Sequence, residues 1–142
     1  MPGIIKIAVE GAKLIRQLTE EEIASSGMNI RYEYSPESFT GTEIDFAIEI
    51  CESVMETLGA TNENPIILNL PSTVEMSTPN TYADQIEYFC TKMKNREAAI
   101  ISIHPHNGPR DMVCCAELAC WRADASKEHC LATASALAIL IL

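Results

Sequence analysis

The sequence predicts an α/β fold in which parallel strands alternate with helices. Segments with helical periodicity alternate with short apolar runs of the kind that form buried strands. The intervening helices are long enough to cross from one parallel strand to the next, which favours right-handed crossovers. Each apolar run also ends in a polar cluster, as in EYSPES, NLPSTVE and HPHN. Polar clusters at successive strand ends are typical of the active-site face of a parallel barrel.

The first helix is predicted from apolar residues at helical spacing, namely Ile4, Ile7, Ala8, Ala12, Ile15 and Leu18. A strand over residues 29–34 (NIRYEY) follows. The next helix has Thr42 as its expected N-cap and Gly59 at its expected end. Its apolar face consists of Ile44, Ala47, Ile48, Cys51 and Met55.

The second half of the chain repeats this alternation. A buried strand is predicted over residues 66–70, followed by a helix capped by Thr78. Pro79 then occupies the first helical position, where its missing N–H leaves no hydrogen bond unmade. A third strand is expected over residues 98–104, and VCCAELAC (residues 113–120) is expected to open another helix.

Composition restricts the possible partners. The chain has 142 residues, the size of one globular domain. Twenty acidic and ten basic side chains give a net charge of −10. This charge repels phosphate backbones and anionic membranes, so neither nucleic acid nor a membrane is an expected partner. The sequence shows no secretory signal and no segment suited to span a bilayer, so a cytoplasmic location is expected.

The six cysteines do not indicate a disulfide framework. Cys51 and Cys90 fall in helical apolar patterns, and reduced thiols are expected in a cytosolic protein. The other four crowd the end of the chain: Cys114, Cys115, Cys120 and Cys130. Their spacing matches no paired Cys-x2-Cys arrangement, so a zinc site is not predicted there.

Two histidines at the end of the third predicted strand are candidate metal ligands. Residues i and i+2 of a strand point to the same side, so His104 and His106 can converge on one cation. The alternative is that both imidazoles hydrogen-bond to backbone and water, and the His-x-His pattern taken alone favours that alternative. Strand-end geometry further predicts that Glu37, Thr73 and His106 share one edge of the sheet.

Three stretches in this order, RYEYSPESFTGTE, NLPSTVEMSTPNTYADQIEY and SIHPHN, closely resemble the 2-isopropylmalate synthase family. The resemblance runs from about Ile4 to Asn107. It implies a (β/α)8 barrel of which this chain holds strands similar to the fifth, sixth and seventh. It also implies a homodimeric acyltransferase that uses a divalent cation to condense acetyl-CoA with 2-oxoisovalerate in leucine biosynthesis.

The resemblance also implies roles for four residues. His104 and His106 match the family's metal ligands, for Mg, Mn or Zn, while Glu37 and Thr73 match residues that face the substrate. The residue types suit this chemistry, because a carboxylate can exchange a proton and a hydroxyl can hydrogen-bond a substrate carboxylate. Helix capping by Glu37 and a strand-end hydrogen bond from Thr73 are the alternatives. Homocitrate or citramalate synthase, or a non-catalytic binding fragment, are the alternative functions.

The sequence departs from the family after Asn107. Residues 1–107 are predicted to be a partial barrel domain, and residues 108–142 an aberrant tail. When SKEHCLATASALA is back-translated and read in another frame, synonymous codons can give the family's EGTLFGNGERTGN. We therefore expect a reading frame disrupted near codons 108 and 120, with a natural divergent tail as the alternative. The eighth strand with its asparagine ligand, and the first strand with its aspartate ligand, are expected to be missing, so the isolated chain is predicted to be inactive.

Overall fold

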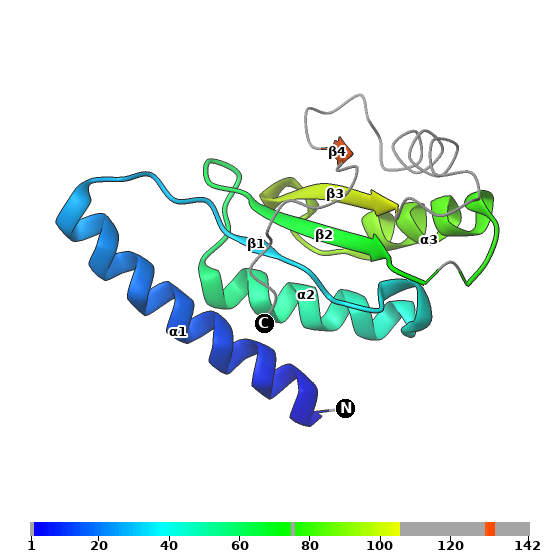
Figure 1. Ribbon diagram of the computed structural model, residues 1–142, viewed down its shortest axis with the longest axis horizontal. Coiled ribbons are helices and arrows are strands. Elements are labelled where there is room, and N and C mark those ends of the chain that lie inside the picture. The colour runs from blue at the N-terminus through cyan, green and yellow to red at the C-terminus, as the bar shows by residue number, and fades with distance from the viewer. Residues whose placement is uncertain (1, 75, 106–129, 133–142) are drawn as a thin grey trace.

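A computed structural model describes residues 2–74, 76–105 and 130–132, which form a parallel sheet flanked by helices (Figure 1). Within these residues the sheet has the strand order β1-β2-β3-β4, and every pair of neighbours is parallel. The strands are β1 (Glu33–Tyr34), β2 (Ile66–Ser72), β3 (Ala99–Pro105) and β4 (Cys130–Ala132). The predicted α/β class with parallel strands is confirmed.

Three helices accompany the described strands. They are α1 (Pro2–Ser26), α2 (Ile44–Leu58) and α3 (Pro79–Lys92), and two short 3-10 turns are added, η1 (Phe39–Gly41) and η2 (Arg96–Ala98). Helices α2 and α3 form the crossovers that lead to β2 and β3, while α1 runs along the outer side of α2 (Figure 1). None of the described helices is both long and apolar enough to cross a bilayer.

The core lies between the sheet and helices α2 and α3. Alternate residues of β2 and β3 pack against these helices, and Leu68, Leu70, Ile101 and Ile103 are fully buried in one cluster with helix residues. Phe39 of η1 joins this cluster through edge-on ring contacts with Tyr82 and Phe89. The intervening strand residues, including Asn69 and Ser102, therefore face the other side of the sheet.

The helix boundaries confirm three of the four predicted signals. Gly59 ends α2 in the left-handed conformation, with φ 72°. Thr78 is the N-cap residue of α3 and Pro79 its first residue, although the Thr78 hydroxyl makes no capping hydrogen bond. Thr42 as the N-cap of α2 was wrong. Its hydroxyl donates instead to the Ser38 carbonyl, and the turn η1 delays the helix so that Glu43 takes the cap position.

The strand boundaries differ mainly at the edge of the sheet. Strands β2 and β3 match the predicted ranges to within two residues. The predicted six-residue strand over 29–34 is shortened to Glu33–Tyr34, with one further hydrogen bond from the Ile67 N–H to the Tyr32 carbonyl. Among the described strands, only β2 pairs with β1. The other side of β1 therefore has no described strand whose hydrogen bonds would extend the strand over more residues.

A strand after β3 was not expected, yet Cys130–Ala132 pairs in parallel with residues 101–103. The expectation that no eighth strand follows is corrected to this extent. The helix predicted over residues 113–120 lies outside the described residues, as does most of the predicted tail. Cys51 and Cys90, whose side chains are described, are both reduced and form no disulfide, and burial raises the pKa of the Cys51 thiol above its ordinary value.

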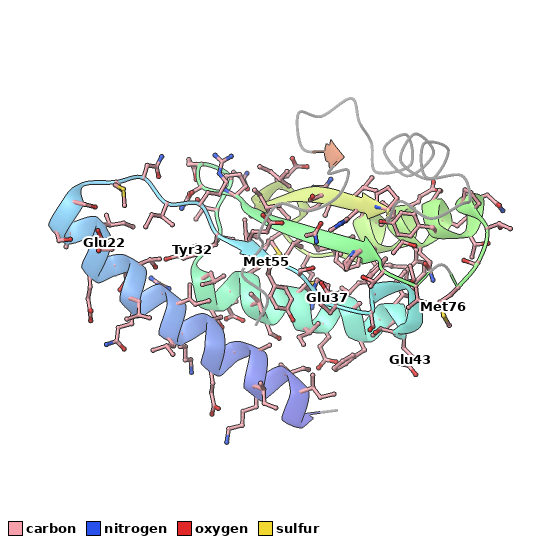
Figure 2. All side chains as sticks on the ribbon, in the orientation of Figure 1. Glu22, Tyr32, Glu37, Glu43, Met55 and Met76 are labelled. Atoms are coloured by element: carbon pink, nitrogen blue, oxygen red, sulfur yellow. The ribbon has the colours of Figure 1, made fainter. Side chains whose placement is uncertain are left out.

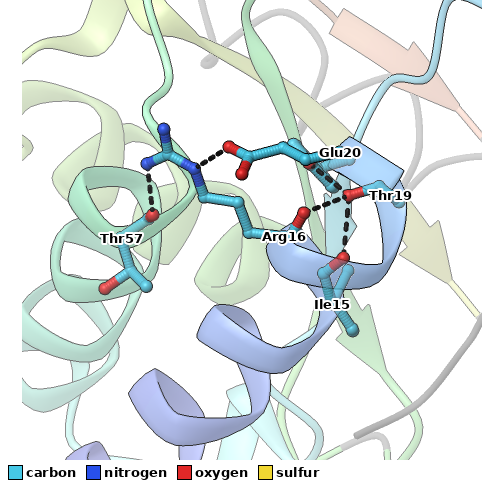
Figure 3. A network of polar contacts seen from close by, with 6 residues as sticks. Ile15, Arg16, Thr19, Glu20 and Thr57 are labelled. Carbon is cyan, nitrogen blue, oxygen red and sulfur yellow. Dashed lines mark hydrogen bonds and ion pairs between the residues drawn. The ribbon is translucent and has the colours of Figure 1, made fainter. Parts of the chain in front are cut away.

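Polar contacts attach α1 to the rest of the fold (Figure 3). The Arg16 guanidinium donates to the Thr57 carbonyl at 3.0 Å and to the Glu20 carboxylate at 2.8 Å. A cation beside the last turn of α2 is favourable because that end of a helix carries partial negative charge. The Thr19 hydroxyl lies 2.6 Å from the Tyr32 hydroxyl, which ties α1 to the segment leading into β1.

Candidate functional site

Polar side chains gather where β1, β2 and β3 approach their carboxyl ends. Ser35 directly follows β1, Asn69 lies within β2, and His104 is the penultimate residue of β3. The register pairs Asn69 with Ser102 and Pro71 with His104. Ser35 and Asn69 are buried, and His104 is half-buried. Three segments far apart in the sequence are therefore brought to one region by the parallel register.

A chain of hydrogen-bonding contacts links these side chains. The Thr73 hydroxyl donates to Glu37 Oε2 and the Ser35 hydroxyl lies within donating distance of Glu37 Oε1, both at 3.3 Å. The Asn69 amide donates to Ser35 Oγ at 2.9 Å and lies 3.4 Å from His104 Nδ1. The contacts run in the order Thr73, Glu37, Ser35, Asn69 and His104. We call these five residues the strand-end chain.

The loops that carry Glu37 and Thr73 are held against each other. Glu37 lies in the loop between β1 and η1 (Figure 2), and Ser38 turns the chain with φ 60°, a left-handed conformation uncommon outside glycine. Phe39, 2% exposed, anchors the next turn in the core. The Thr40 hydroxyl donates to the Val74 carbonyl at 2.9 Å. The exposed Glu37 carboxylate is thus fixed by its buried neighbours.

Asn69 is the least expected member of the strand-end chain. It is 1% exposed, and its Oδ1 has no hydrogen-bond partner among the described residues. A buried acceptor without a partner is costly, by about 1–3 kcal/mol, and in native proteins such a group is often completed by a bound ligand, ion or water. The middle of β2 therefore holds an acceptor oxygen without a partner among the described residues, on the side chain whose amide nitrogen lies beside the His104 ring.

The structure brings together three of the four predicted site residues. Glu37 and Thr73 are in contact, and His104 is connected to them through Ser35 and Asn69. His106 lies outside the described residues. Sequence reasoning missed Ser35 and Asn69. A polar residue in the middle of the buried run IILNLP was the signal that could have identified Asn69, because such a residue needs a partner.

Of the two predicted metal ligands, His104 lies within the described residues. Among them, no three His, Cys, Asp or Glu side chains are grouped to hold an ion. Neighbouring side chains supply two donor types suited to such a centre, the imidazole nitrogens of His104 and the Asn69 Oδ1, although the Asn69 atom 3.4 Å from His104 Nδ1 is the amide nitrogen. Both atom types are ligands of divalent cations in proteins.

Comparison with protein families matches residues 1–123 to the HMGL-like family. The chain belongs to the HMGL-like family. The predicted barrel class agrees with this membership, because HMGL-like domains are TIM barrels. The family match runs past Asn107 as far as residue 123.

Curated relatives of this HMGL-like chain carry the family name that its sequence motifs suggested. The chain is 55% identical to the 2-isopropylmalate synthase of Rhodospirillum rubrum over 117 residues, 82% of this chain and 21% of that protein. It is 48% identical to the 2-isopropylmalate synthase of Parafrankia sp. over 129 residues, which are 91% of this chain and 22% of that protein. It is 53% identical to the 2-isopropylmalate synthase of Rhizobium johnstonii over 117 residues, which are 82% of this chain and 20% of that protein. The predicted resemblance is confirmed, and the chain spans about a fifth of the length of these relatives.

Membership of the HMGL-like family gives the strand-end chain its functional context. In TIM barrels the catalytic groups come from the carboxyl ends of several strands and the loops that follow them. Glu37 and Thr73 lie in such loops, and His104 lies at such a strand end. The site therefore occupies the face of the fold on which barrel enzymes carry out their chemistry.

Proposed function

We propose that this chain is a segment of a 2-isopropylmalate synthase. The parent enzyme condenses the acetyl group of acetyl-CoA with 2-oxoisovalerate and releases CoA, a step of leucine biosynthesis. The observation that carries the proposal is the strand-end chain, which connects Glu37, Thr73 and His104 at the carboxyl ends of three adjacent parallel strands. The names of the relatives support the choice of substrates.

Glu37 is the proposed proton-exchanging group. Its two carboxylate oxygens face the Thr73 and Ser35 hydroxyls, so its orientation is set before a substrate arrives. A carboxylate held in this way can exchange a proton with a reacting group that lies within hydrogen-bonding distance. The exposed Thr73 hydroxyl is the proposed donor to the substrate carboxylate, and it would exchange its present bond to Glu37 for that contact.

His104 and His106 are the proposed protein ligands of a divalent cation, which is Mg, Mn or Zn. When bound, such a cation polarises the keto oxygen of the 2-oxo acid and orients it. The Asn69 amide nitrogen lies 3.4 Å from His104 Nδ1. A ligating imidazole donates its other ring N–H to an oxygen, so His104 would bind the cation once Asn69 turns its Oδ1, now without a partner among the described residues, toward Nδ1. We propose that Asn69 orients His104 and that Ser35 orients Asn69.

The remaining parts of the proposal concern the chain as a whole. The parent enzyme is a homodimer in the cytoplasm, and residues 108–142 derive from a disrupted reading frame. The isolated chain is inactive, because transition-state stabilisation requires the cation to be held rigidly against both substrates. With only two of the family's protein ligands in this sequence, its metal affinity is low.

A chimera tests the proposal directly. Residues 1–107 of this chain would replace the matched segment of the Rhodospirillum rubrum enzyme, and CoA release would be followed with a thiol reagent. We expect turnover that depends on 2-oxoisovalerate, a fall of at least about 100-fold for Glu37→Gln, and a similar fall for His104→Ala. Glu63→Gln, an exposed change in the α2–β2 loop, is the matched control and should leave the rate unchanged.

Two results would refute the proposal. A folded chimera that ignores 2-oxoisovalerate but condenses acetyl-CoA with a different 2-oxo acid would assign the segment to another acyltransferase. A chimera whose turnover survives both site substitutions would remove Glu37 and His104 from the chemistry.

The 142-residue chain assayed alone should release no CoA above background.

A further inference from the structure

The hydroxyl proton of Ser35 has more than one acceptor within reach. Ser35 is 6% exposed, and its Oγ lies 3.3 Å from Glu37 Oε1 and 3.4 Å from the backbone carbonyl oxygen of Asn69. A hydroxyl carries a single proton, so it donates to one of these oxygens at a time. The same Oγ accepts from the Asn69 amide nitrogen at 2.9 Å. Ser35 is therefore the residue through which a change at Asn69 can reach Glu37.

The Asn69 amide can exchange its two ends. Its nitrogen contacts both Ser35 Oγ and His104 Nδ1, while its buried Oδ1 has no partner among the described residues. A half-turn about χ2 would put the oxygen where the nitrogen now lies, because the two ends of an amide are nearly the same in size. The turn would bring Oδ1 next to a hydroxyl and a ring nitrogen, which can both act as donors. It therefore offers the buried oxygen the partners that it lacks.

The position of the proton on the His104 ring selects between the two arrangements. With the Asn69 nitrogen donating to it, Nδ1 is an acceptor, and a neutral ring then carries its proton on Nε2. An imidazole that ligates a cation through Nε2 carries its proton on Nδ1 and donates it to an oxygen. The Asn69 nitrogen cannot accept that proton. Ligation by His104 therefore requires the Asn69 Oδ1 to face Nδ1.

We propose that Asn69 and Ser35 form a two-position relay that couples ligation at His104 to the release of Glu37. The inference rests on the proposed function, in which His104 is a cation ligand and Glu37 exchanges the proton. Once Oδ1 has turned, the Ser35 hydroxyl donates to it, because that position is 2.9 Å away and Glu37 Oε1 is 3.3 Å away. Glu37 Oε1 thereby loses its contact with Ser35, while Oε2 keeps its contact with the Thr73 hydroxyl.

The relay makes proton exchange by Glu37 depend on an occupied cation site. Without ligation, the Ser35 hydroxyl can donate to Glu37 Oε1 and so occupies an oxygen that the chemistry needs. With ligation, this oxygen is open and the carboxylate stays oriented through its other oxygen. Asn69 and Ser35 are positioning residues in this relay, because both are buried and act through His104 and Glu37.

Nuclear magnetic resonance of the complete 142-residue chain tests the relay without an activity assay. Zn²⁺ is the probe, added at constant pH to a chain with isotope-labelled histidine and asparagine nitrogens. We expect the His104 Nδ1 signal to change from that of an unprotonated nitrogen to that of an N–H at saturation. Cross-peaks between the Asn69 amide protons and Ser35 should be lost over the same Zn²⁺ range. Thiolates also bind Zn²⁺, so a titration of His104→Ala defines the changes that the cysteines cause.

Two substitutions of Asn69 separate the relay from a structural role. Asn69→Asp places an acceptor oxygen at both ends of the side chain, so His104 Nδ1 should carry its proton before Zn²⁺ is added. Asn69→Leu has no acceptor, and Zn²⁺ binding at His104 should weaken by about tenfold or more. If Asn69 only filled space, Asn69→Asp would leave the proton on Nε2. Circular dichroism checks that both variants retain the fold.

The link to Glu37 requires a separate measurement. In a chain with labelled glutamate carboxyl carbons, the Glu37 signal should shift as Zn²⁺ saturates the site. Ser35→Ala leaves His104 able to bind but has no hydroxyl to move, so the Glu37 shift should fall to about half or less. Ser53→Ala is the matched control, because the Ser53 hydroxyl donates to the Glu49 carbonyl on the exposed side of α2. It should leave the Glu37 shift unchanged.

Three results would overturn the relay. They are a His104 Nδ1 that already carries its proton before Zn²⁺ is added, Asn69 cross-peaks that persist when His104 is ligated, and a Glu37 shift that Ser35→Ala leaves intact. All three leave His104 as a ligand and the chimera assay of the proposed function unaffected. A His104 ring that does not bind Zn²⁺ would instead refute the relay together with the proposed ligand role of His104.

Discussion

The two halves of the described fold differ in how many neighbours each element has. From α2 to β3, both strands pair on two sides, and Ala47, Cys51, Phe89 and Ile101 are completely buried. In α1 and β1, the helix exposes a full apolar stripe and the strand pairs on one side only. Both halves follow the same alternation of helix and strand. They differ in whether a neighbouring strand and helix lie on both sides. A βα unit of a barrel completes its burial only when both neighbours are in place.

The largest expected effect is a cavity in the enclosed half. Phe89 is completely buried and meets Phe39 edge-on, with ring centroids 5.8 Å apart. Phe89→Ala should lower the free energy of unfolding by about 3–5 kcal/mol, measured by urea denaturation. The neighbouring Tyr88, 39% exposed, is the control, and Tyr88→Ala should cost less than about 1 kcal/mol. Similar losses at both positions would contradict the burial pattern.

A smaller effect is expected where the two halves meet. Gly59 has φ 72°, and a Cβ added there would lie 3.3 Å from Arg16 Nη1, the group that caps α2. Gly59→Ala should therefore cost about 1–2 kcal/mol in the same denaturation experiment. Gly41→Ala is the control, since an added Cβ meets nothing within 4 Å and φ is not positive. A neutral Gly59→Ala would show that α1 can move away from α2 without loss.

Alkaline pH tests the burial of β1 itself. Burial, with a smaller contribution from Cys51, raises the pKa of Tyr34 to about 12. The unfolded chain ionises this phenol near pH 10, so stability present below pH 10 is lost as the pH rises toward 12. Tyr34→Phe should therefore lose less stability than the unchanged chain between pH 9 and pH 11 in urea denaturation. Equal losses in the two proteins would mean that Tyr34 is accessible to solvent.

The smallest effect is expected on the exposed apolar stripe of α1, which consists of Ile4, Ile7, Leu14 and Leu18. Ile7 is 72% exposed, so Ile7→Ala should change the free energy of unfolding by less than about 0.5 kcal/mol in the isolated chain. Ala12, covered by α2, offers the opposite case, and Ala12→Ser should be clearly destabilising. A large cost in the isolated chain would mean that the stripe is already covered.

The sequence predicted the elements best where local signals are strong. Gly59 ends α2 because it adopts a left-handed conformation, and Pro79 begins α3 because it lacks an N–H. Thr42 was wrong as a cap because the buried Phe39 draws the chain into a 3-10 turn before α2 begins. The strand ending at Tyr34 was predicted too long, because its extent depends on neighbours that periodicity does not reveal.

The sequence by itself determined the alternation of helix and strand, the parallel arrangement and the motifs that place Glu37, Thr73 and His104 at strand ends. Those features follow from local periodicity and from short sequence motifs, which can be recognised without knowledge of distant contacts. Only the tertiary structure decided that Asn69 joins Ser35 to His104, residues 34 and 35 positions away along the chain. It also decided which stripe of α1 is covered. Both depend on strand register and helix packing, which local periodicity does not encode.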